Sequence, residues 1–485
     1  MKKLIPLLII ICLLLPSCQL KKPHIADETT IGAMATPDVA ATTDVPYSDT
    51  MMTTTHIYGT SATNTENRFT TLPLRTTKHH TTTKAYTTLP TKPTTTTKIN
   101  TTSTTNKITN TTTTAPQIED TELRGVWISC YDHINASNKT RAQYKTETDT
   151  MFSNIKNLGL NTAFVHLRAF SDAFYQSDIY PYSAFIAGKE GASLAFDPFE
   201  VILESAKKYG ISVHGWINPF RVSTKKDINL LSAKNPAKAI IDSGNANGEI
   251  CILENGIYYN PSCTENHKRI IDGVREIITK YNIDGIHIDD YFYPSTEKSV
   301  DSTQYSQYKS NGGSLSLAQW RTANVNSFVS TLYSTVKSHN SNLIFSISPS
   351  AKFEENKNTL YADCGLWLAN KGYADLIIPQ IYFGFKHETL GFENLLGQWG
   401  RLQRNPSVKL ACGIAAYKCA TADNYAGKGK NEWIENSDIL ARQTISVRKN
   451  PNYCGFVLFS YKDIIRAGCK TEIQNLKETI NTGKN

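Results

Sequence analysis

The sequence predicts an α/β protein whose main domain is a (β/α)8 TIM barrel, preceded by a signal peptide and a disordered Thr-rich tether. Three observations predict this organisation. A short apolar run follows two lysines at the N-terminus, a threonine-rich segment comes next, and about 360 residues of alternating strand and helix patterns complete the chain. We therefore divide the chain into a signal peptide over 1–17, a tether over 18–118 and a barrel over 119–485.

The first 18 residues resemble a bacterial lipoprotein signal. Met1–Leu15 reads MKKLIPLLIIICLLL, and its roughly 12-residue apolar run is too short to span a ~30 Å hydrocarbon core as a helix. The following Pro16-Ser17-Cys18 completes a lipobox-like sequence, which predicts cleavage before Cys18 and attachment of a lipid to its sulfur. The alternative is a plain signal peptide with an incidental cysteine. Lipidation predicts that the protein is anchored to the outer face of the cell membrane and faces the cell wall.

Residues 18–118 have the composition of a tether. Between Thr53 and Thr114, 29 of 62 residues are threonine, and Glu66 is the single acid beside seven basic side chains. Few apolar residues and no period of 2 or 3.6 are present, so the segment cannot bury enough surface to fold. Residues 1–114 carry +5 of the formal net charge of +8. The barrel is therefore nearly neutral, which disfavours a nucleic-acid partner and favours recognition through aromatic rings and hydrogen bonds.

Eight apolar, β-rich runs mark the predicted strands of the barrel. They are Leu123–Ser129, Thr162–Arg168, Ser212–Asn218, Gly285–Asp290, Ile344–Pro349, Leu376–Tyr382, Lys409–Ala415 and Cys454–Ser460. Amphipathic stretches such as Phe199–Tyr209 and His267–Tyr281 lie between them, and Gly159 and Gly210 mark turns from helix to strand. A doubly wound sheet is the rival fold, but it would place a glycine-rich phosphate loop after the first strand, where Leu123–Tyr131 has none.

The barrel segment holds eight cysteines, an even number that permits disulfides in an exported protein. None of them has the Cys-x-x-Cys or Cys/His spacing that is typical of a structural zinc site. Free buried thiols fit the sequence equally well, so the sequence leaves the pairing of these cysteines open.

Polar and aromatic side chains gather at the carboxyl ends of the predicted strands, where the active sites of such barrels lie. Residues two apart on a strand share a face, so several of these side chains project together toward the barrel mouth. Burial of so many polar groups is costly without partners, which favours a functional cluster. The cluster comprises His166, Arg168, His214, Trp216, Asn218, Arg221, His287, Asp289, Asp290, Gln380, Tyr382 and Ser460.

At these residues the sequence resembles the glycosyl hydrolase-like 10 family of bacterial lipoproteins. The matching stretches are RGVWIS (124–129), NTAFVHLRAFSDAFYQS (161–177), FDPFEVILESAKKYGISVHGWINPFR (196–221), DGIHIDDYFYP (284–294), ADLIIPQIYFG (374–384) and GFVLFSYKD (455–463). The resemblance implies a TIM barrel that hydrolyses glycosidic bonds. A similar enterobacterial cell-division lipoprotein cleaves peptidoglycan glycan strands, which implies a peptidoglycan-like polysaccharide as the substrate class here. His166 stands where the family more often has Gln, and Ser350-Ala351-Lys352 departs from the usual Phe-Gly.

Glycoside cleavage needs two carboxyl groups, one protonated as an acid and one ionised as a nucleophile or base. Asp289 is the predicted ionised partner, because it ends the fourth strand in DGIHIDD, a pattern similar to the nucleophile strand of α-amylase-like barrels. Asp290 is the predicted acid, although adjacent aspartates also cap helices or bind cations. Asp172 and Asp197 are alternative acids, and the Pro198 that follows Asp197 predicts that Asp197 is a helix N-cap.

The other strand-end residues are predicted to bind substrate through hydrogen bonds and ring stacking. They are His166, Arg168, His214, Trp216, Asn218, Arg221, His287, Tyr291, Tyr293, Gln380 and Tyr382. No cofactor and no metal is expected. Two other functions stay open. A non-catalytic glycan-binding lipoprotein would lack a paired acid near Asp289, and a metal-dependent hydrolase would use the strand-end histidines without the tight spacing common in metal sites.

Overall fold

The computed structural model describes residues 122–289 and 291–482. The predicted signal peptide over 1–17, the lipidation site Cys18 and the tether over 18–118 lie outside the described residues, as does Asp290. Within the described ranges, none of the helices is both long and apolar enough to cross a membrane.

The described chain folds into a parallel β-barrel surrounded by helices, which confirms the predicted (β/α)8 class. The strand order is β10-β9-β8-β7-β3-β2-β1-β12-β11, and each neighbouring pair is parallel. The strands are β1 (Leu123–Ile128), β2 (Thr162–Arg168), β3 (Ser212–Ile217), β7 (Gly285–Ile288), β8 (Ile344–Ile347), β9 (Leu376–Ile377), β10 (Lys409–Leu410), β11 (Cys412–Ala415) and β12 (Gly455–Phe459).

The strand pieces β10 and β11 close the barrel, because they are two parts of one run on either side of Ala411. On one side of this run, Ala411 N–H donates to the carbonyl of Ile377 at 2.9 Å. On the other side, the carbonyl of Leu410 accepts a hydrogen bond from Cys454 N–H at 2.7 Å. Closure removes the unpaired edges that an open sheet would expose.

The sixth strand is shorter than predicted. We expected Leu376–Tyr382, whereas β9 ends at Ile377, two residues before Pro379. Proline has no N–H to donate, so it interrupts the regular ladder at this point. Beyond it, isolated parallel bridges join Gln380 to the chain on both sides, which keeps Gln380 in line with the neighbouring strands.

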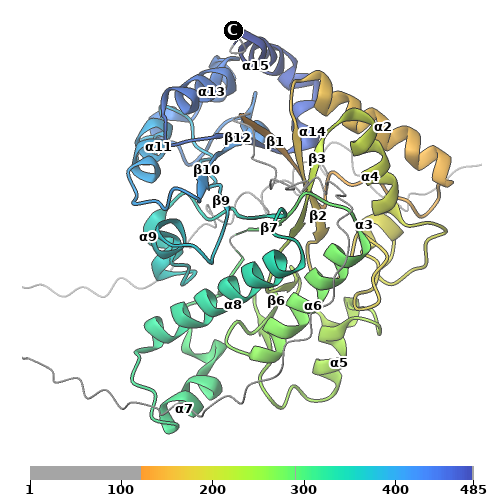
Figure 1. The fold of residues 1–485 in the computed structure, drawn as a ribbon, viewed down its shortest axis with the longest axis vertical. Helices are drawn as coiled ribbons and strands as arrows, with labels where there is room; N and C mark the ends of the chain where they lie inside the picture. Colours follow the sequence, from red (N-terminus) through yellow and green to blue (C-terminus); the bar gives the residue numbers. More distant parts are fainter. Residues whose placement is uncertain (1–121, 290, 483–485) are drawn as a thin grey trace, which may run out of the picture. The chain divides into compact units, whose positions relative to one another are not determined.

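Helices pack around the outside of the barrel, where α2 lies beside α4 and α13 lies beside α15 (Figure 1). The helices are α2 (Arg141–Asn157), α3 (Ala184–Ala187), α4 (Pro198–Tyr209), α5 (Pro236–Asp242), α6 (Thr264–Lys280), α7 (Ser302–Ser310), α8 (Leu317–His339), α9 (Phe353–Asn358), α10 (Cys364–Ala369), α11 (Phe392–Gly400), α12 (Glu432–Glu435), α13 (Ile439–Lys449), α14 (Tyr461–Ile464) and α15 (Lys470–Thr482). The two helices that we predicted by range correspond to α4 and α6.

Local sequence signals set both ends of α4. Asp197 is the N-cap and accepts a hydrogen bond from Phe199 N–H at 3.0 Å, and Pro198 occupies the first turn. Gly210 ends the helix with a φ of 62°, in the left-handed region that favours glycine. The N-cap role predicted for Asp197 is therefore confirmed, and its second oxygen accepts a hydrogen bond from the hydroxyl of Tyr281.

A small antiparallel sheet that the sequence analysis did not predict follows β3. Its strands β4 (Arg221–Ser223), β6 (Gly256–Tyr259) and β5 (Ile250–Leu253) pair in that order, and α5 lies between β4 and β5 in the chain. In Figure 1, β6 is drawn level with α6 and α8, with α5 below α6 and α7 below α8. The insertion matters for the site because Arg221 is the first residue of β4, so its backbone is held by the pairing with Tyr258.

Two large apolar cores and a small third cluster of Cys130, Ala169, Phe174 and Ile186 stabilise the barrel, and their burial is the main favourable term in folding. The larger core joins the outer faces of the strands to the helices. The smaller core fills the barrel interior and comprises Trp127, Phe164, Trp216, Leu376, Ile378, Tyr382, Ala411, Ala415, Val457 and Phe459. The eight cysteines in the described ranges are free thiols, and all of them except Cys454 are buried.

A buried ion pair ties the segment after β7 to α8. Arg321 of α8 and Asp301 are both completely buried, and the guanidinium donates hydrogen bonds to the two carboxylate oxygens at 2.7 and 2.8 Å. Other N–H groups of Arg321 donate to the carbonyls of Thr296 and Glu297. This segment follows β7, at whose carboxyl end Asp289 lies. The ion pair therefore fixes the backbone that continues from this strand end.

Replacing Arg321 with methionine should lower the free energy of unfolding by about 3–5 kcal/mol, because it leaves Asp301 as an uncompensated buried charge. Urea denaturation followed by circular dichroism measures the change. The matched control is Lys226→Met, which breaks a largely exposed ion pair with Glu254 and should change the free energy by less than about 0.5 kcal/mol. Equal losses in the two variants would contradict the stabilising role of Arg321.

Candidate active site at the barrel mouth

Three neighbouring strands bring most of the predicted site residues together. β2, β3 and β7 are hydrogen-bonded neighbours, and their register places His166 beside Trp216 and Trp216 beside His287. Side chains two apart on a strand share a face, so Asp289 continues the inward-facing row of His287, whereas a register shift after His166 pairs Arg168 with Ile217. These rows end at the carboxyl edge of the barrel, which we call the barrel mouth.

His287 lies inside the barrel, and hydrogen bonds fix its ring. The indole N–H of Trp127 donates to Nε2 of His287 at 3.0 Å, so the imidazole proton is on Nδ1, which donates to Ser346 Oγ at 2.8 Å. Ser348 Oγ lies 3.1 Å from Nε2. Burial lowers the pKa of His287 well below its ordinary value, which keeps the ring neutral. Both ring nitrogens are therefore engaged by protein groups.

His166 is held in the opposite tautomer. Cys130 N–H donates to Nδ1 of His166 at 3.2 Å, so Nε2 carries the proton and donates to Oδ1 of Asn218 at 3.0 Å. The imidazole stacks on the indole of Trp216 with 3.7 Å between the ring centroids. Burial lowers the pKa of His166 well below its ordinary value. His166 therefore orients the Asn218 side chain.

The geometry of these histidines does not resemble a metal site. Across residues 122–289 and 291–482, no group of three or more His, Cys, Asp or Glu side chains could hold a metal ion. A metal ligand needs an imidazole nitrogen without a proton or another partner, and the nitrogens of His166 and His287 are engaged as described above.

His214 and Tyr293 lie apart from the group at the mouth. His214 pairs in register with Gly285, one pleat below the level of His287, and burial lowers its pKa to about 4. Tyr293 packs against the ion pair of α8, with its ring centroid 5.1 Å from Cζ of Arg321 and 5.0 Å from the ring of Tyr361. These contacts place neither side chain beside the strand end of β7.

Arg168 organises the loop that follows β3. Its Nη1 donates to the carbonyls of Asn218 at 2.6 Å and Pro219 at 2.9 Å, and Cζ lies 4.9 Å from the ring centroid of Tyr180. The side chain is buried, so these partners compensate part of the cost of placing a charge inside the protein. The loop that Arg168 holds leads directly to Arg221.

Asp289, Tyr291 and Arg221 form one contiguous group at the mouth. Asp289 follows β7 directly, is 2% exposed, and accepts a hydrogen bond from Tyr291 N–H at Oδ1 with a distance of 3.3 Å. The guanidinium of Arg221 lies over the ring of Tyr291, with Cζ 4.4 Å from its centroid and 5.4 Å from that of Phe170. The predicted nucleophile is therefore bonded to the backbone of Tyr291, whose ring the guanidinium of Arg221 covers.

Gln380 and Tyr382 complete the inward-facing row of the sixth strand. Nε2 of Gln380 donates to the carbonyl of Ser348 at 3.0 Å. The ring of Tyr382 meets that of Trp127 edge-on at 6.4 Å and lies 5.7 Å from that of Phe459. Both side chains are buried, so their contacts link the mouth to the aromatic core inside the barrel.

Half-buried aromatic residues that the sequence analysis missed form the rim of the mouth. Tyr131, Phe170 and Tyr417 follow β1, β2 and β11 by two or three residues. Nζ of Lys462, just after β12, lies 5.3 Å from the ring centroid of Tyr131. Their positions immediately beyond the strands could have identified them, because the loops after the strands carry the sites of such barrels. Aromatic rings in this position suit the apolar faces of sugars.

The alternative acids have different surroundings. Burial raises the pKa of Asp172 to about 7, against the opposing effects of a hydrogen bond with Ser183 and the charge of Arg168. Asp197 is already used by the N-cap of α4 and by the hydroxyl of Tyr281. Asp172 is therefore the alternative acid that would hold a proton near neutral pH.

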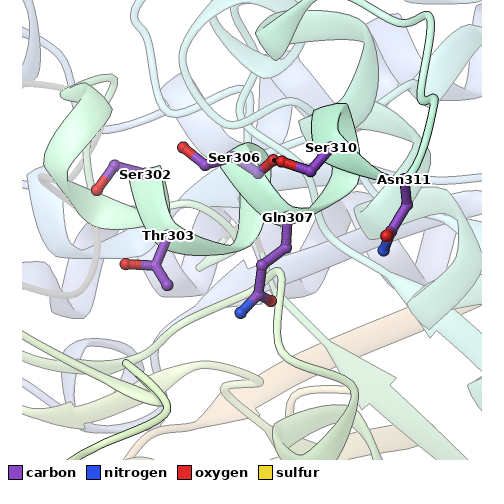
Figure 2. Close-up of a pocket in the computed structure, with 6 residues that line it drawn as sticks. All are labelled: Ser302, Thr303, Ser306, Gln307, Ser310 and Asn311. Carbon is purple, nitrogen blue, oxygen red and sulfur yellow. Dashed lines mark hydrogen bonds between the residues drawn. The ribbon is translucent and has the colours of Figure 1, made fainter.

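Two surface hollows lie away from this group. One, with a volume of about 540 Å³, follows α7, where Figure 2 shows a row of hydroxyl and amide side chains. Its lining comprises Ser302, Thr303, Ser306, Gln307, Ser310 and Asn311. The other hollow is lined by α9, α11 and neighbouring residues. Neither lining includes a predicted site residue, and the first lacks titratable side chains, so the group at the mouth remains the candidate site.

The chain is similar to known proteins over most of its barrel. A family described as glycosyl hydrolase-like 10 matches residues 122–433. The chain is 31% identical to glycosyl hydrolase YngK of Bacillus subtilis (strain 168) over 367 residues, which cover 71% of this chain and 69% of that protein. It is 27% identical to glycosyl hydrolase DigH of Escherichia coli (strain K12) over 373 residues, which cover 70% of this chain and 82% of that protein. Among solved structures, the catalytic domain of a β-amylase from Paenibacillus polymyxa aligns with a TM-score of 0.47 and 10% identity over 76% of this chain and 99% of that chain.

The family match extends from the residue before β1 into α12 and includes the strand ends that carry Asp289 and Arg221. It spans 312 of the 485 residues, since it runs from 122 to 433. This chain belongs to the glycosyl hydrolase-like 10 family.

Proposed function

We propose that the protein is a glycosidase that hydrolyses a cell-envelope glycan, namely the glycan strands of peptidoglycan, by carboxylate acid/base catalysis. The observation that carries the proposal is the group of Asp289, Tyr291 and Arg221 at the carboxyl end of β7. A buried carboxylate at a mouth rimmed by aromatic rings suits chemistry on a sugar. The family and the names of its relatives YngK and DigH support the same reaction class.

In this mechanism Asp289 is the ionised partner, and Asp290 donates a proton to the leaving oxygen. The hydrogen bond from Tyr291 N–H to Asp289 stabilises the charged form of the carboxyl group. The low exposure of Asp289 strengthens its electrostatic interaction with the positive charge that develops on the sugar in the transition state.

Sugar binding uses the rim and the amide of Asn218. The rings of Tyr131, Phe170 and Tyr417 offer stacking surfaces at the mouth. Because His166 occupies Oδ1 of Asn218, the amide NH2 group of Asn218 is the part left to donate to a hydroxyl or an N-acetyl carbonyl. These contacts would hold the chain of sugars across the strand ends.

The cell-envelope substrate is supported by the predicted export signal and lipid anchor. A lipid on Cys18 would hold the protein at the membrane, and a coil of the length of the tether over 18–118 has a mean reach of about 50–60 Å. An anchored barrel with this reach would contact the cell wall, in which the glycan strands of peptidoglycan are the available polysaccharide. This location therefore favours peptidoglycan over a storage or dietary glycan.

Replacing Asp289 with asparagine should lower the release of sugar fragments from purified peptidoglycan by roughly 10²–10⁴-fold, because the amide cannot act as nucleophile or base. Mass analysis of the soluble products measures the release. The matched control, Asp272→Asn on the outer face of α6, removes a carboxylate that pairs with Lys268 and Arg275 and should keep full activity. Full activity in a folded Asp289→Asn variant would contradict the proposal. If the wild type binds peptidoglycan without cleaving it, the protein is a glycan-binding lipoprotein instead.

Two further asparagine variants test the acid. Asp290→Asn should slow cleavage by roughly 10²–10⁴-fold, because the leaving oxygen loses its proton donor. Asp172→Asn should keep most of the activity, because the neutral amide resembles the protonated carboxyl that Asp172 presents below pH 7. Initial rates on the same peptidoglycan glycan compare the variants. The reverse order of the two rates would assign the acid to Asp172.

Asp172 also predicts a pH dependence of stability. The folded protein keeps this proton up to about pH 7, whereas the ordinary carboxyl pKa is 3.8, so the free energy of unfolding falls as the pH rises between these values. Asp172→Asn cannot ionise, so its stability relative to the wild type should rise between pH 5 and pH 7 by up to about 1.4 kcal/mol per pH unit. Urea denaturation at both pH values measures the difference, and a constant difference would show that Asp172 titrates normally.

A further inference from the structure

Arg221 differs from the other arginines that are buried in the described part of the chain. Arg321 pairs with Asp301, and Arg168 donates to two backbone carbonyls through Nη1, although its Nε and Nη2 are also buried without a partner among the described residues. Arg221 is 5% exposed, and its Nε and Nη1 are completely buried without a hydrogen-bond partner among the described residues. No carboxylate of a described residue forms an ion pair with Arg221. Its positive charge is therefore uncompensated by the folded chain that the structure describes.

An isolated buried charge is expensive, and proteins normally pair it or bind it to an ion. The rings of Tyr291 and Phe170 offset part of this cost through cation–π contacts at 4.4 and 5.4 Å. These ring contacts do not neutralise the positive charge of Arg221. A guanidinium kept in these surroundings is suited to a ligand that supplies the negative charge.

The backbone around Arg221 holds the guanidinium at the mouth. Arg221 pairs with Tyr258 at the start of β4, and the loop before it is fixed by the hydrogen bonds of Arg168 to Asn218 and Pro219. The side chain ends over Tyr291, whose N–H donates to Asp289. A donor that is already in place loses little freedom when a ligand binds, so it is an efficient recognition group.

We propose that Arg221 binds a carboxylate of the sugar polymer, so that the substrate is an acidic glycan and Arg221 determines this specificity. The inference rests on the proposed function and adds the chemical group that the site recognises. One unpaired guanidinium matches one negative charge, and its planar fork fits a carboxylate. The near-neutral charge of the barrel had favoured substrate recognition without charged groups. The inference changes this expectation at one position, Arg221. A lactyl ether and a uronic acid present the same carboxylate chemistry.

The test measures how tightly the full chain binds oligosaccharides with and without the carboxylate. The Asp289→Asn variant is used so that the glycan stays intact. The probes are a peptidoglycan glycan oligosaccharide with free lactyl carboxylates, a uronic-acid oligosaccharide, and both after chemical reduction of the carboxyl groups to alcohols. Isothermal titration calorimetry gives each Kd. Reduction of the preferred acidic probe should weaken binding by about 10- to 100-fold, because a charge-assisted hydrogen bond is lost.

Arginine variants in the same background assign this effect. Arg221→Met should bind the native and the reduced probe with equal Kd, and Arg221→Lys should keep part of the difference, because it retains the charge without the planar fork. Arg275→Met removes an arginine that is exposed on α6 and should keep the whole difference. The acidic probe that binds more tightly identifies which carboxylate the site accepts. Circular dichroism confirms that each variant is folded.

Two results would overturn the inference, and they are distinguishable. If Arg221→Met and Arg221→Lys weaken binding of native and reduced probes equally, Arg221 supports the site without recognising a carboxylate, and the proposed function stands. If no probe binds and the wild type releases no sugar fragments, the proposed function fails and the inference fails with it.

Discussion

The hydrogen bond from Trp127 to His287 shows the constraint on which the rest of the structure depends. The interior of the barrel is largely apolar, so an inward-facing polar atom is costly to bury without a hydrogen-bond partner. Trp127 on β1 supplies the proton that fixes the tautomer of His287 on β7, and Ser346 on β8 accepts from the other nitrogen. Two rings and one hydroxyl from three strands are therefore held in one arrangement, which also fixes the level at which β7 delivers Asp289 to the mouth.

The same constraint separates supporting residues from candidate functional residues. His166 and His287 are neutral and hydrogen-bonded at both nitrogens, so they orient their neighbours. Arg221 lies at the level where the barrel opens, and its charge has no counter-charge among the described residues. The buried guanidinium of Arg221 therefore points to the mouth, beside Tyr291, as the place where a ligand supplies a missing partner.

Sequence reasoning predicted the fold well because the signals are local. Strand runs, the N-cap at Asp197 and the glycine at 210 each depend on a few adjacent residues, and the structure shows them, with the sixth strand shorter than predicted. The site was predicted less completely, because its partners are distant in sequence: Trp127 and His287 are 160 residues apart. The inserted sheet of β4, β5 and β6 was missed because strands of three or four residues leave little pattern. Without that sheet, the fixed position of Arg221 could not be foreseen.

The central claim is that the barrel mouth adds water across a glycosidic bond. The most direct measurement is digestion of purified peptidoglycan glycan strands by the full chain in water enriched in ¹⁸O, followed by mass analysis of the new chain ends. Hydrolysis predicts one ¹⁸O atom at each new reducing end in the wild type. New ends that carry no label, or a wild type that creates no new ends, would contradict the account.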